Sequence, residues 1–166
     1  MAWEGAWPSL ELSNLTSGFK ALEALVDQGS SDLPDEVAAN LARFLVVRAC
    51  GYLEQVVEKS LASYMSSKSS PRVARYGVSW LGRGANPGPG NLVSLVQRFD
   101  PVFAEELSEF FGHDDELLKR DVAFLVDARN KIAHGRSESV RARRALDLST
   151  SVHHVAEWFI QTFDPR

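Results

Sequence analysis

The chain has 166 residues, a formal net charge of −4 at pH 7 and a single cysteine, Cys50. A chain of this length forms one domain by default, and one cysteine excludes an internal disulfide and a multi-cysteine zinc site. No stretch supplies the about 20 apolar residues of a membrane-spanning helix, and the N-terminal residues lack the basic and apolar regions of a signal peptide. We therefore expect a cytoplasmic domain without membrane contact, and the acidic balance excludes broad nucleic-acid binding driven by overall charge.

The basic residues are unevenly distributed along the chain. Residues 66–98 hold five Lys or Arg and no acidic residue, and residues 129–144 hold six Lys or Arg and one glutamate. Each stretch has a net charge of +5, so the rest of the chain carries −14. Such segregation predicts either a local anion-binding surface on an acidic body or two solvated faces that never meet.

Apolar residues recur at helical spacing along almost the whole chain. A first helix is predicted over residues 10–26, within about 9–27, and the polar segment 28–33 ends it. A long second helix is predicted from Pro34 to residue 65, because proline suits the first helical position and the acidic residues after it favour the first turn. Its predicted core stripe comprises Val46, Cys50, Leu53, Val57, Leu61 and Tyr64.

Turn-forming residues dominate the next segment. We expect a short helix over 73–81 and a connecting loop over 82–90, which lacks the Gly-Lys-Ser/Thr ending of a phosphate loop. Asn91 is expected to cap a helix over 92–99.

The remaining sequence predicts three helices. Asp100 and Pro101 begin one that ends at Gly112, and residues 114–116 begin another that ends at His134. Ser137 or Ser139 is expected to cap the last helix, whose predicted core positions are Leu148, Val152, Val155, Phe159 and Phe163. No alternating strand pattern occurs, so the prediction is an all-α antiparallel bundle of about five main helices. It forms a single domain over residues 1–166, with a core of about 34–163.

The most informative stretch is residues 125–135. It contains Arg129, Asn130 and His134 in the pattern R-N-x-x-x-H, followed by Gly135, which suits the residue after a helix end. Asn130 and His134 are four residues apart and share one helix face, whereas Arg129 and His134 lie about 140° apart. Arg129 therefore either curls around the helix or works with the histidine of another subunit.

An all-α domain whose late helix ends in R-N-x-x-x-H-G resembles the HEPN superfamily, and within it the RiboL-PSP-type HEPN domains. The motif covers residues 129–135, and the helical layout of about 34–163 is compatible with the family. The resemblance implies a metal-independent endoribonuclease without a cofactor, often a toxin or defence effector with an antitoxin partner. It also implies a homodimer in which the motif helices of two subunits meet in one cleft.

The residue types of the motif suit that chemistry. RNA is cut when its 2′-hydroxyl attacks the adjacent phosphate, which needs a base, an acid and a cation near the developing charge. His134 can act as base or acid near neutral pH, Arg129 suits phosphate, and Asn130 can bind phosphate or orient the histidine. The motif holds no carboxylate cluster, so no metal is expected. The flanking basic residues are expected to hold the RNA backbone: Lys131, Arg136, Arg141, Arg143 and Arg144.

Two residues of the second predicted helix are supporting candidates. Arg48 interrupts an apolar run and either points into the cleft or makes an internal ion pair or hydrogen bond. Glu54 either orients Arg129 or His134, pairs with Arg48, or belongs to a solvated face.

Three other features have structural interpretations beside functional ones. The adjacent His153 and His154 diverge by about 100° on a helix and cannot easily share a metal. Trp80 either stacks on a base or packs in a core or interface. Cys50 is expected to be a small buried apolar residue without a basic neighbour in sequence.

Two functions of different classes follow from the sequence. The intact set of Arg129, Asn130 and His134 favours an active endoribonuclease that binds RNA. The acidic composition and the lack of a recognised RNA-binding domain favour a catalytically silent HEPN-like dimer that serves as an antitoxin or adaptor. A third interpretation is a capped helix end that carries the three residues by chance.

Overall fold

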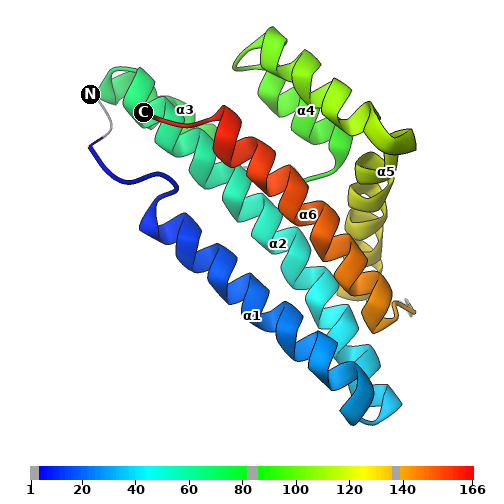
Figure 1. Cartoon of the computed structure of the whole chain (residues 1–166). Coiled ribbons are helices and arrows are strands. Elements are labelled where there is room, and N and C mark those ends of the chain that lie inside the picture. Colours follow the sequence, from blue (N-terminus) through cyan, green and yellow to red (C-terminus); the bar gives the residue numbers. More distant parts are fainter. Residues whose placement is uncertain (1–3, 82–85, 136–138) are drawn as a thin grey trace.

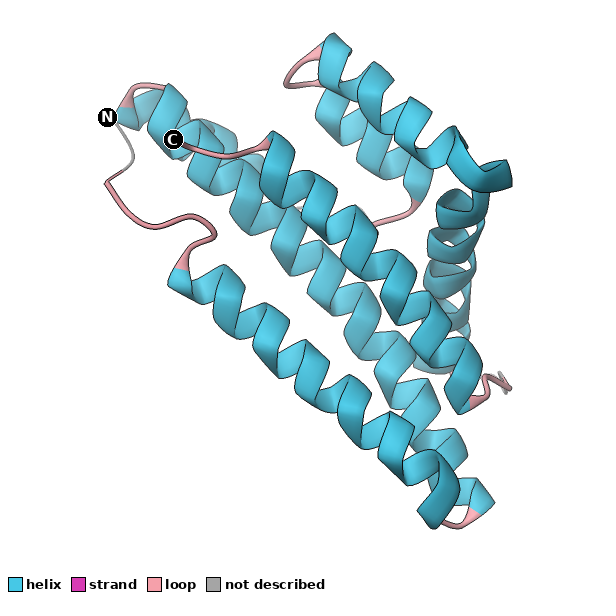
Figure 2. Cartoon of the chain, in the orientation of Figure 1, coloured by secondary structure: helices cyan, strands magenta, loops and turns pink. Residues whose placement is uncertain are grey.

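The computed structural model describes residues 4–81, 86–135 and 139–166. These residues form six α-helices and no strand (Figures 1 and 2), which confirms the all-α prediction. The helices are α1 (Leu10–Asp32), α2 (Asp35–Lys68), α3 (Pro71–Leu81), α4 (Pro89–Gln97), α5 (Pro101–Ala133) and α6 (Ala142–Thr162). None of the helices within the described residues combines the length and the apolarity that a membrane span requires.

The core is built around α2, which packs against α1, α3, α5 and α6. Figure 1 shows α1, α2 and α6 side by side, with α4 and α5 on the other side of α6. The stripe predicted for α2 is confirmed: five of its residues are buried, and the sixth, Tyr64, is half-buried. The five are Val46, Cys50, Leu53, Val57 and Leu61. All five core positions predicted for α6 are likewise buried.

Helix α1 is longer than the sequence predicts, because the polar segment 28–33 continues the helix to Asp32. The backbone N–H of Leu33 donates to the Gly29 carbonyl at 3.2 Å and ends the helix there. A Cβ at Gly29 would lie 2.9 Å from Leu33 Cδ1 and 3.6 Å from Leu41 Cδ1 of α2. Glycine therefore leaves room for these two leucine side chains. Tertiary packing therefore overrides the local turn signal.

The predicted starts of α4 and α6 are wrong. Helix α4 begins at Pro89 after Gly88, and Asn91 binds Asn86 instead of capping the helix. Helix α6 begins after Arg141 with no side-chain cap, so Ser139 does not cap it, and Ser137 lies outside the described residues. Proline fixes the backbone dihedral that a first helical turn needs, which explains the earlier start of α4.

Helix α5 bends sharply where the sequence predicts a break. Its start is as predicted: Asp100 caps the helix by accepting from the N–H of Val102 at 2.8 Å. Residues 114–116 do not form the first turn of a new helix, because all three have left-handed backbone with φ from 50° to 60°. The bend turns the second half of α5 away from the first (Figure 1), so that the segment ending at Ala133 packs on α2.

The carboxylate of Asp121 joins the second half of α5 to α6. It is buried, with 4% of its surface exposed, and it accepts from Arg144 Nη2 at 2.8 Å and from Ser151 Oγ at 2.5 Å. Arg144 also lies over the Phe124 ring, with its Cζ atom 5.2 Å from the ring centroid. The buried hydroxyl of Ser151 has no route to water if this acceptor is removed.

We predict that Asp121→Ala lowers the free energy of unfolding by about 2 kcal/mol, because a buried hydroxyl loses its acceptor and a guanidinium loses its partner. Urea unfolding followed by circular dichroism measures this. Asp147→Ala is the matched control, since it breaks an exposed pair with Arg143 and should cost within about 0.5 kcal/mol. Equal losses in the two variants would contradict a structural role for Asp121.

Candidate active site

Arg129 and Asn130 lie on the last turns of α5, where this helix packs against α2. Leu125 and Ala128 are buried on α5 and Leu53 is buried on α2, so apolar packing sets the approach of the two helices. The buried face of α5 carries Arg129 against α2, and the side chain is half-buried there. The position of the arginine therefore follows from core packing and not from a flexible loop.

The guanidinium of Arg129 is held by two side chains of α2. Its Nη2 atom donates to Glu54 Oε1 at 2.7 Å, and its Nε atom donates to Cys50 Sγ at 3.5 Å. Cys50 Sγ in turn lies 3.9 Å from Glu54 Oε1. Cys50 and Glu54 are four residues apart, so both project from one face of α2. Among the alternatives for Glu54, the structure gives the contact with Arg129.

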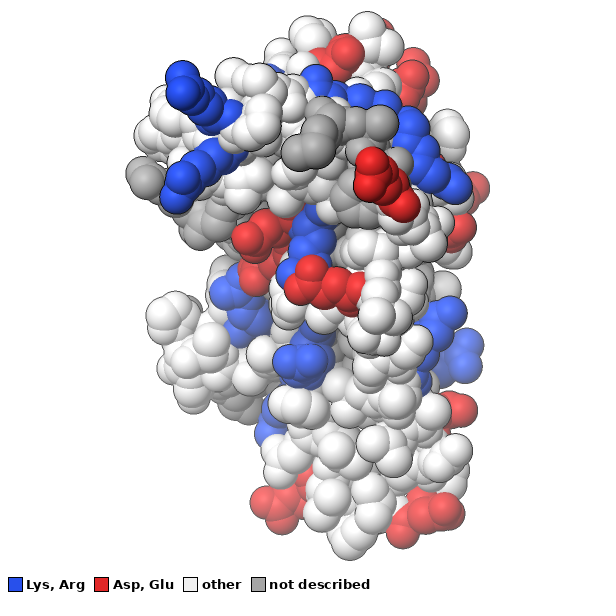
Figure 3. All heavy atoms as spheres, turned by 90° about the vertical axis from the view of Figure 1, so that its left-hand side faces the viewer, with Lys and Arg blue, Asp and Glu red and all other residues white. Residues whose placement is uncertain are grey.

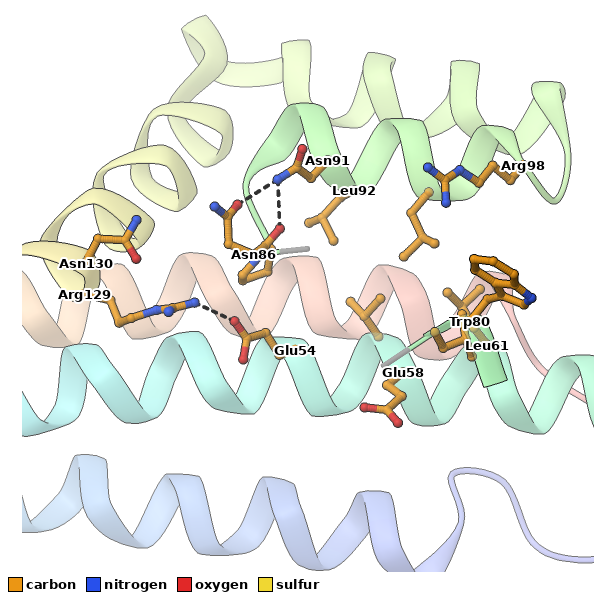
Figure 4. Close-up of a pocket in the computed structure, with 14 residues that line it drawn as sticks. Glu54, Glu58, Leu61, Trp80, Asn86, Asn91, Leu92, Arg98, Arg129 and Asn130 are labelled. Atoms are coloured by element: carbon orange, nitrogen blue, oxygen red, sulfur yellow. Dashed lines mark hydrogen bonds and ion pairs between the residues drawn. The ribbon is translucent and has the colours of Figure 1, made fainter. Parts of the chain in front are cut away.

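A cavity of about 580 Å³ opens beside this contact, and four helices and the loop before α4 line it. Figure 4 shows Arg129 and Asn130 at one end and Trp80 and Arg98 at the other. The remaining lining residues are Glu54, Val57, Glu58, Leu61, Leu81, Asn86, Pro87, Asn91, Leu92 and Leu95. The sequence did not predict this cavity, because its walls come from α2, α3, α4 and α5.

Each of the two basic stretches contributes one described basic residue to this cavity. Arg98 comes from residues 66–98 and Arg129 from residues 129–144, and both line it. On the face that Figure 3 draws, basic and acidic side chains are interspersed. Acidic side chains mark its lower end, where Figure 1 places the turn between α1 and α2. A local anion-binding surface is thus limited to a few residues.

His134 lies apart from the cavity. It is the residue at which α5 ends, its side chain is exposed, and it is not one of the lining residues. The backbone N–H of His134 donates to the Asn130 carbonyl at 3.1 Å. Gly135 has a φ of 68°, which confirms its predicted place just after the helix end. One copy of the chain thus brings Arg129 and Asn130 together but leaves the imidazole outside.

The flanking basic residues differ in their surroundings. Arg141 is exposed immediately before α6, and Arg143 is exposed and lies 3.2 Å from Asp147. Lys131 pairs with Asp127 at 2.8 Å, and Arg144 is held at Asp121. Arg136 lies outside the described residues. Their role toward RNA stays a prediction, and Arg144 has a structural contact that the sequence did not reveal.

Among the residues that the structure describes, Arg48 does not make the internal ion pair that was one alternative for it, and its place in a cleft between two subunits stays a prediction. Its side chain is exposed, it does not line the cavity, and Glu54 pairs with Arg129 instead. The apolar run around Arg48 is therefore not buried on all sides: Phe44, one turn earlier on α2, is 51% exposed. A run that is apolar on nearly all sides predicts either burial or an interface, and the exposed Phe44 leaves the interface as a prediction.

Cys50 is buried, as the sequence predicts, but the fold gives it a basic neighbour. Burial raises the pKa of the Cys50 thiol above its ordinary value, and the hydrogen bond and charge of Arg129 oppose that rise. The hydrogen bond from Arg129 to Cys50 raises the pKa of the guanidinium, which stays cationic. Cys50 is therefore a neutral packing partner of the arginine.

A second cavity, of about 610 Å³, lies between α1 and α6 and is lined in part by Tyr52 and His153. His153 Nε2 lies 2.9 Å from Glu23 Oε2, and its ring packs on Phe19 at 5.1 Å between centroids. Within the described residues, no three His, Cys, Asp or Glu side chains come together as metal ligands. His153 thus has a structural environment, whereas its neighbour His154 is exposed.

Comparison with known proteins gives one match. The family model described as RiboL-PSP-HEPN matches residues 13–163, which is most of the chain and spans α1 to the end of α6. No curated protein and no solved structure gave a significant match. The match confirms the family resemblance that residues 129–135 carry, and it agrees with the all-α fold.

We predict that the stability of the protein falls as the pH rises through the alkaline range because of Cys50. The thiol has a higher pKa in the folded than in the unfolded chain, so its contribution is complete below the unfolded pKa, about 8.5, and is lost above it. The unfolding free energy should fall by at most about 1.4 kcal/mol per pH unit there. Urea unfolding between about pH 7 and 9.5 measures this slope.

Cys50→Ala is the control for this prediction. It should lower stability by a pH-independent amount and flatten the alkaline slope, since the titrating group is gone. An unchanged slope in the variant would assign the alkaline destabilisation to another group.

Proposed function

The chain belongs to the RiboL-PSP-HEPN family, and we propose that it is an endoribonuclease that cleaves RNA without a metal ion. The observation that carries the proposal is the Arg129–Asn130 end of the cavity. A permanently charged guanidinium and an amide face one concave site, and Glu54 fixes the orientation of the guanidinium. Such a pair of hydrogen-bonding groups suits a phosphate with charge developing on its oxygens.

The proposed reaction uses the substrate's own nucleophile. A histidine takes the proton of the 2′-hydroxyl, and the 2′-oxygen forms a bond to phosphorus. The bond from phosphorus to the 5′-oxygen breaks, and a second acid donates a proton to that leaving oxygen. The products are a 2′,3′-cyclic phosphate and a 5′-hydroxyl. Arg129 stabilises the added negative charge on the phosphoryl oxygens.

A homodimer supplies what one subunit lacks. His134 is exposed at the end of α5 and does not line the cavity that holds Arg129. In a symmetric dimer whose α5 ends meet, the partner subunit's His134 approaches Arg129 and takes the proton of the 2′-hydroxyl, so each of the two composite sites needs one arginine and one histidine. The basic residues beside the motif, Arg141 and Arg143 among them, then flank the cleft and hold the RNA backbone.

One observation favours the silent interaction module instead. Arg129 already has a carboxylate partner at 2.7 Å, so part of its charge is neutralised before any phosphate arrives. In that case the chain acts as an antitoxin or adaptor, whereas the active enzyme acts as a toxin or defence effector. Both roles keep the dimer, and cleavage of RNA separates them.

We predict that the purified protein cleaves RNA in excess EDTA and leaves 2′,3′-cyclic phosphate ends. His134→Ala and Arg129→Ala should each lower the rate at least about 100-fold, because an acid–base group or the charge on the phosphate is lost. Gel analysis of end-labelled RNA measures the rate and the chemistry of the ends. Arg75→Ala removes an exposed arginine of α3 and is the control that should keep full activity.

Two results would contradict this proposal. Folded parent protein that cuts no RNA would support the silent module, and activity that survives His134→Ala would place the chemistry at another site or in a contaminant.

We predict that mixing two inactive variants restores cleavage. When Arg129→Ala and His134→Ala subunits form a heterodimer, one composite site has lost both residues and the other retains both. After random exchange half of the dimers are heterodimers, and each heterodimer has one intact site out of two. About a quarter of the parent rate should therefore return. No recovery, with exchange shown by native mass spectrometry, would place arginine and histidine of one subunit in the same site.

A further inference from the structure

The end of the cavity opposite Arg129 presents an aromatic ring and a cation. Trp80, in the last turn of α3, is 53% exposed and lines the cavity, and Tyr76 packs edge-on against it with 6.1 Å between ring centroids. Arg98, the residue at which α4 ends, is exposed and lines the same space. Figure 4 shows Arg98 and Trp80 at the same end of the cavity. The exposed surface of Trp80 is what base stacking, which the sequence left open for this residue, requires.

Two asparagines between the ends of the cavity present unused hydrogen-bonding groups. Asn86 Oδ1 accepts from Asn91 Nδ2 at 2.8 Å and from the Gly88 N–H at 3.1 Å. The Asn91 amide also donates to the Asn86 carbonyl at 3.2 Å. These contacts leave the amide nitrogen of Asn86 and the side-chain oxygen of Asn91 without a protein partner among the described residues. A donor and an acceptor on a fixed frame match the edge of a nucleobase.

The cavity lining holds one arginine at each end and two glutamates, Glu54 and Glu58. Glu54 is engaged by Arg129, and Figure 4 shows the carboxylate of Glu58 directed away from Arg98. The cavity lining also includes the buried apolar side chains of Leu61 and Leu92. An aromatic ring over an apolar floor binds a base by stacking, and an arginine beside it binds the phosphate.

We propose that the Trp80–Arg98 end of the cavity is a nucleotide subsite for single-stranded RNA. It binds a nucleotide near the one that is cleaved, and in this it rests on the proposed function. Glu54 beside Arg129 and Leu61 beside Trp80 are seven residues apart on α2, about 10 Å along the helix axis. A stacked strand advances about 3.4 Å per nucleotide, so the cavity spans two or three nucleotides. The subsite thereby favours unpaired RNA, whose bases are free to stack.

Binding to a fluorescein-labelled single-stranded RNA tests the subsite, with full-length His134→Ala protein as the parent so that no RNA is cut. Trp80→Ala should weaken binding about tenfold, because a stacked base loses its platform. Trp80→Phe should stay within about threefold of the parent, whereas Trp80→Leu, which keeps apolar volume without an aromatic face, should resemble Trp80→Ala. Fluorescence anisotropy measures the dissociation constants.

Arg98→Ala should weaken binding. It should also make the slope of log K against log salt shallower by the amount that about one phosphate contact contributes. Arg72→Ala is its matched control, since Arg72 is an exposed arginine of α3 that does not line the cavity. It should stay within about twofold of the parent. In the cleaving enzyme, Trp80→Leu should raise KM and leave kcat close to the parent value.

The outcomes separate the subsite from the nuclease. If the wild-type protein cleaves RNA but Trp80→Leu binds as tightly as the parent, the subsite is wrong and the nuclease stands. If Trp80 and Arg98 govern binding but no RNA is cut, the subsite stands and the nuclease is wrong. Affinity for a duplex of the same sequence equal to that for the single strand, or no RNA binding at all, would overturn the subsite.

Discussion

The guanidinium of Arg129 is fixed between two side chains of α2, and the geometry of the candidate site depends on that contact. Glu54 and Cys50 hold it at 2.7 Å and 3.5 Å, and their spacing of four residues places both on the face that meets α5. An arginine that is already ordered loses less side-chain entropy when it binds a phosphate. The carboxylate of Glu54 therefore orients the guanidinium of Arg129 for an anion. The same carboxylate neutralises part of the positive charge of that guanidinium.

The bend in α5 gives the cavity its second wall. The first half of α5 packs on α4, and the second half packs on α2 and α6. Residues 114–116 have left-handed backbone without glycine, which costs about 1–2 kcal/mol per residue. Burial of Leu107 and Phe111 before the bend and of Val122 and Leu125 after it offsets that cost, because each buried side chain contributes about 1.5–3 kcal/mol. A straight α5 would carry the motif away from α2.

The parts of the fold that depend on local spacing follow from the sequence, and the parts that depend on distant contacts do not. The core stripes of α2 and α6 are as predicted, because helical periodicity alone sets them. The end of α1 differs, since the helix continues through the polar segment to Asp32, where Gly29 lies close to Leu41 of α2. The motif residues were found as a pattern, but the cavity that Trp80 and Arg98 share with them joins helices far apart in sequence. The sequence offered Glu54 as one possible partner of Arg129, but it gave no signal for Cys50.

In the proposed function, the selectivity of an acidic chain for RNA depends on the position of His134 and on a few contacts in the cavity. In the proposed dimer, a lone subunit has the phosphate site of Arg129 without an acid or base, so cleavage requires two subunits. The net charge of −4 keeps nonspecific attraction to RNA weak. Affinity must then come from a few contacts at fixed places, and the cavity supplies arginines at its two ends with amides between them. Such short-range contacts favour a segment of unpaired RNA over the uniform charge of a duplex.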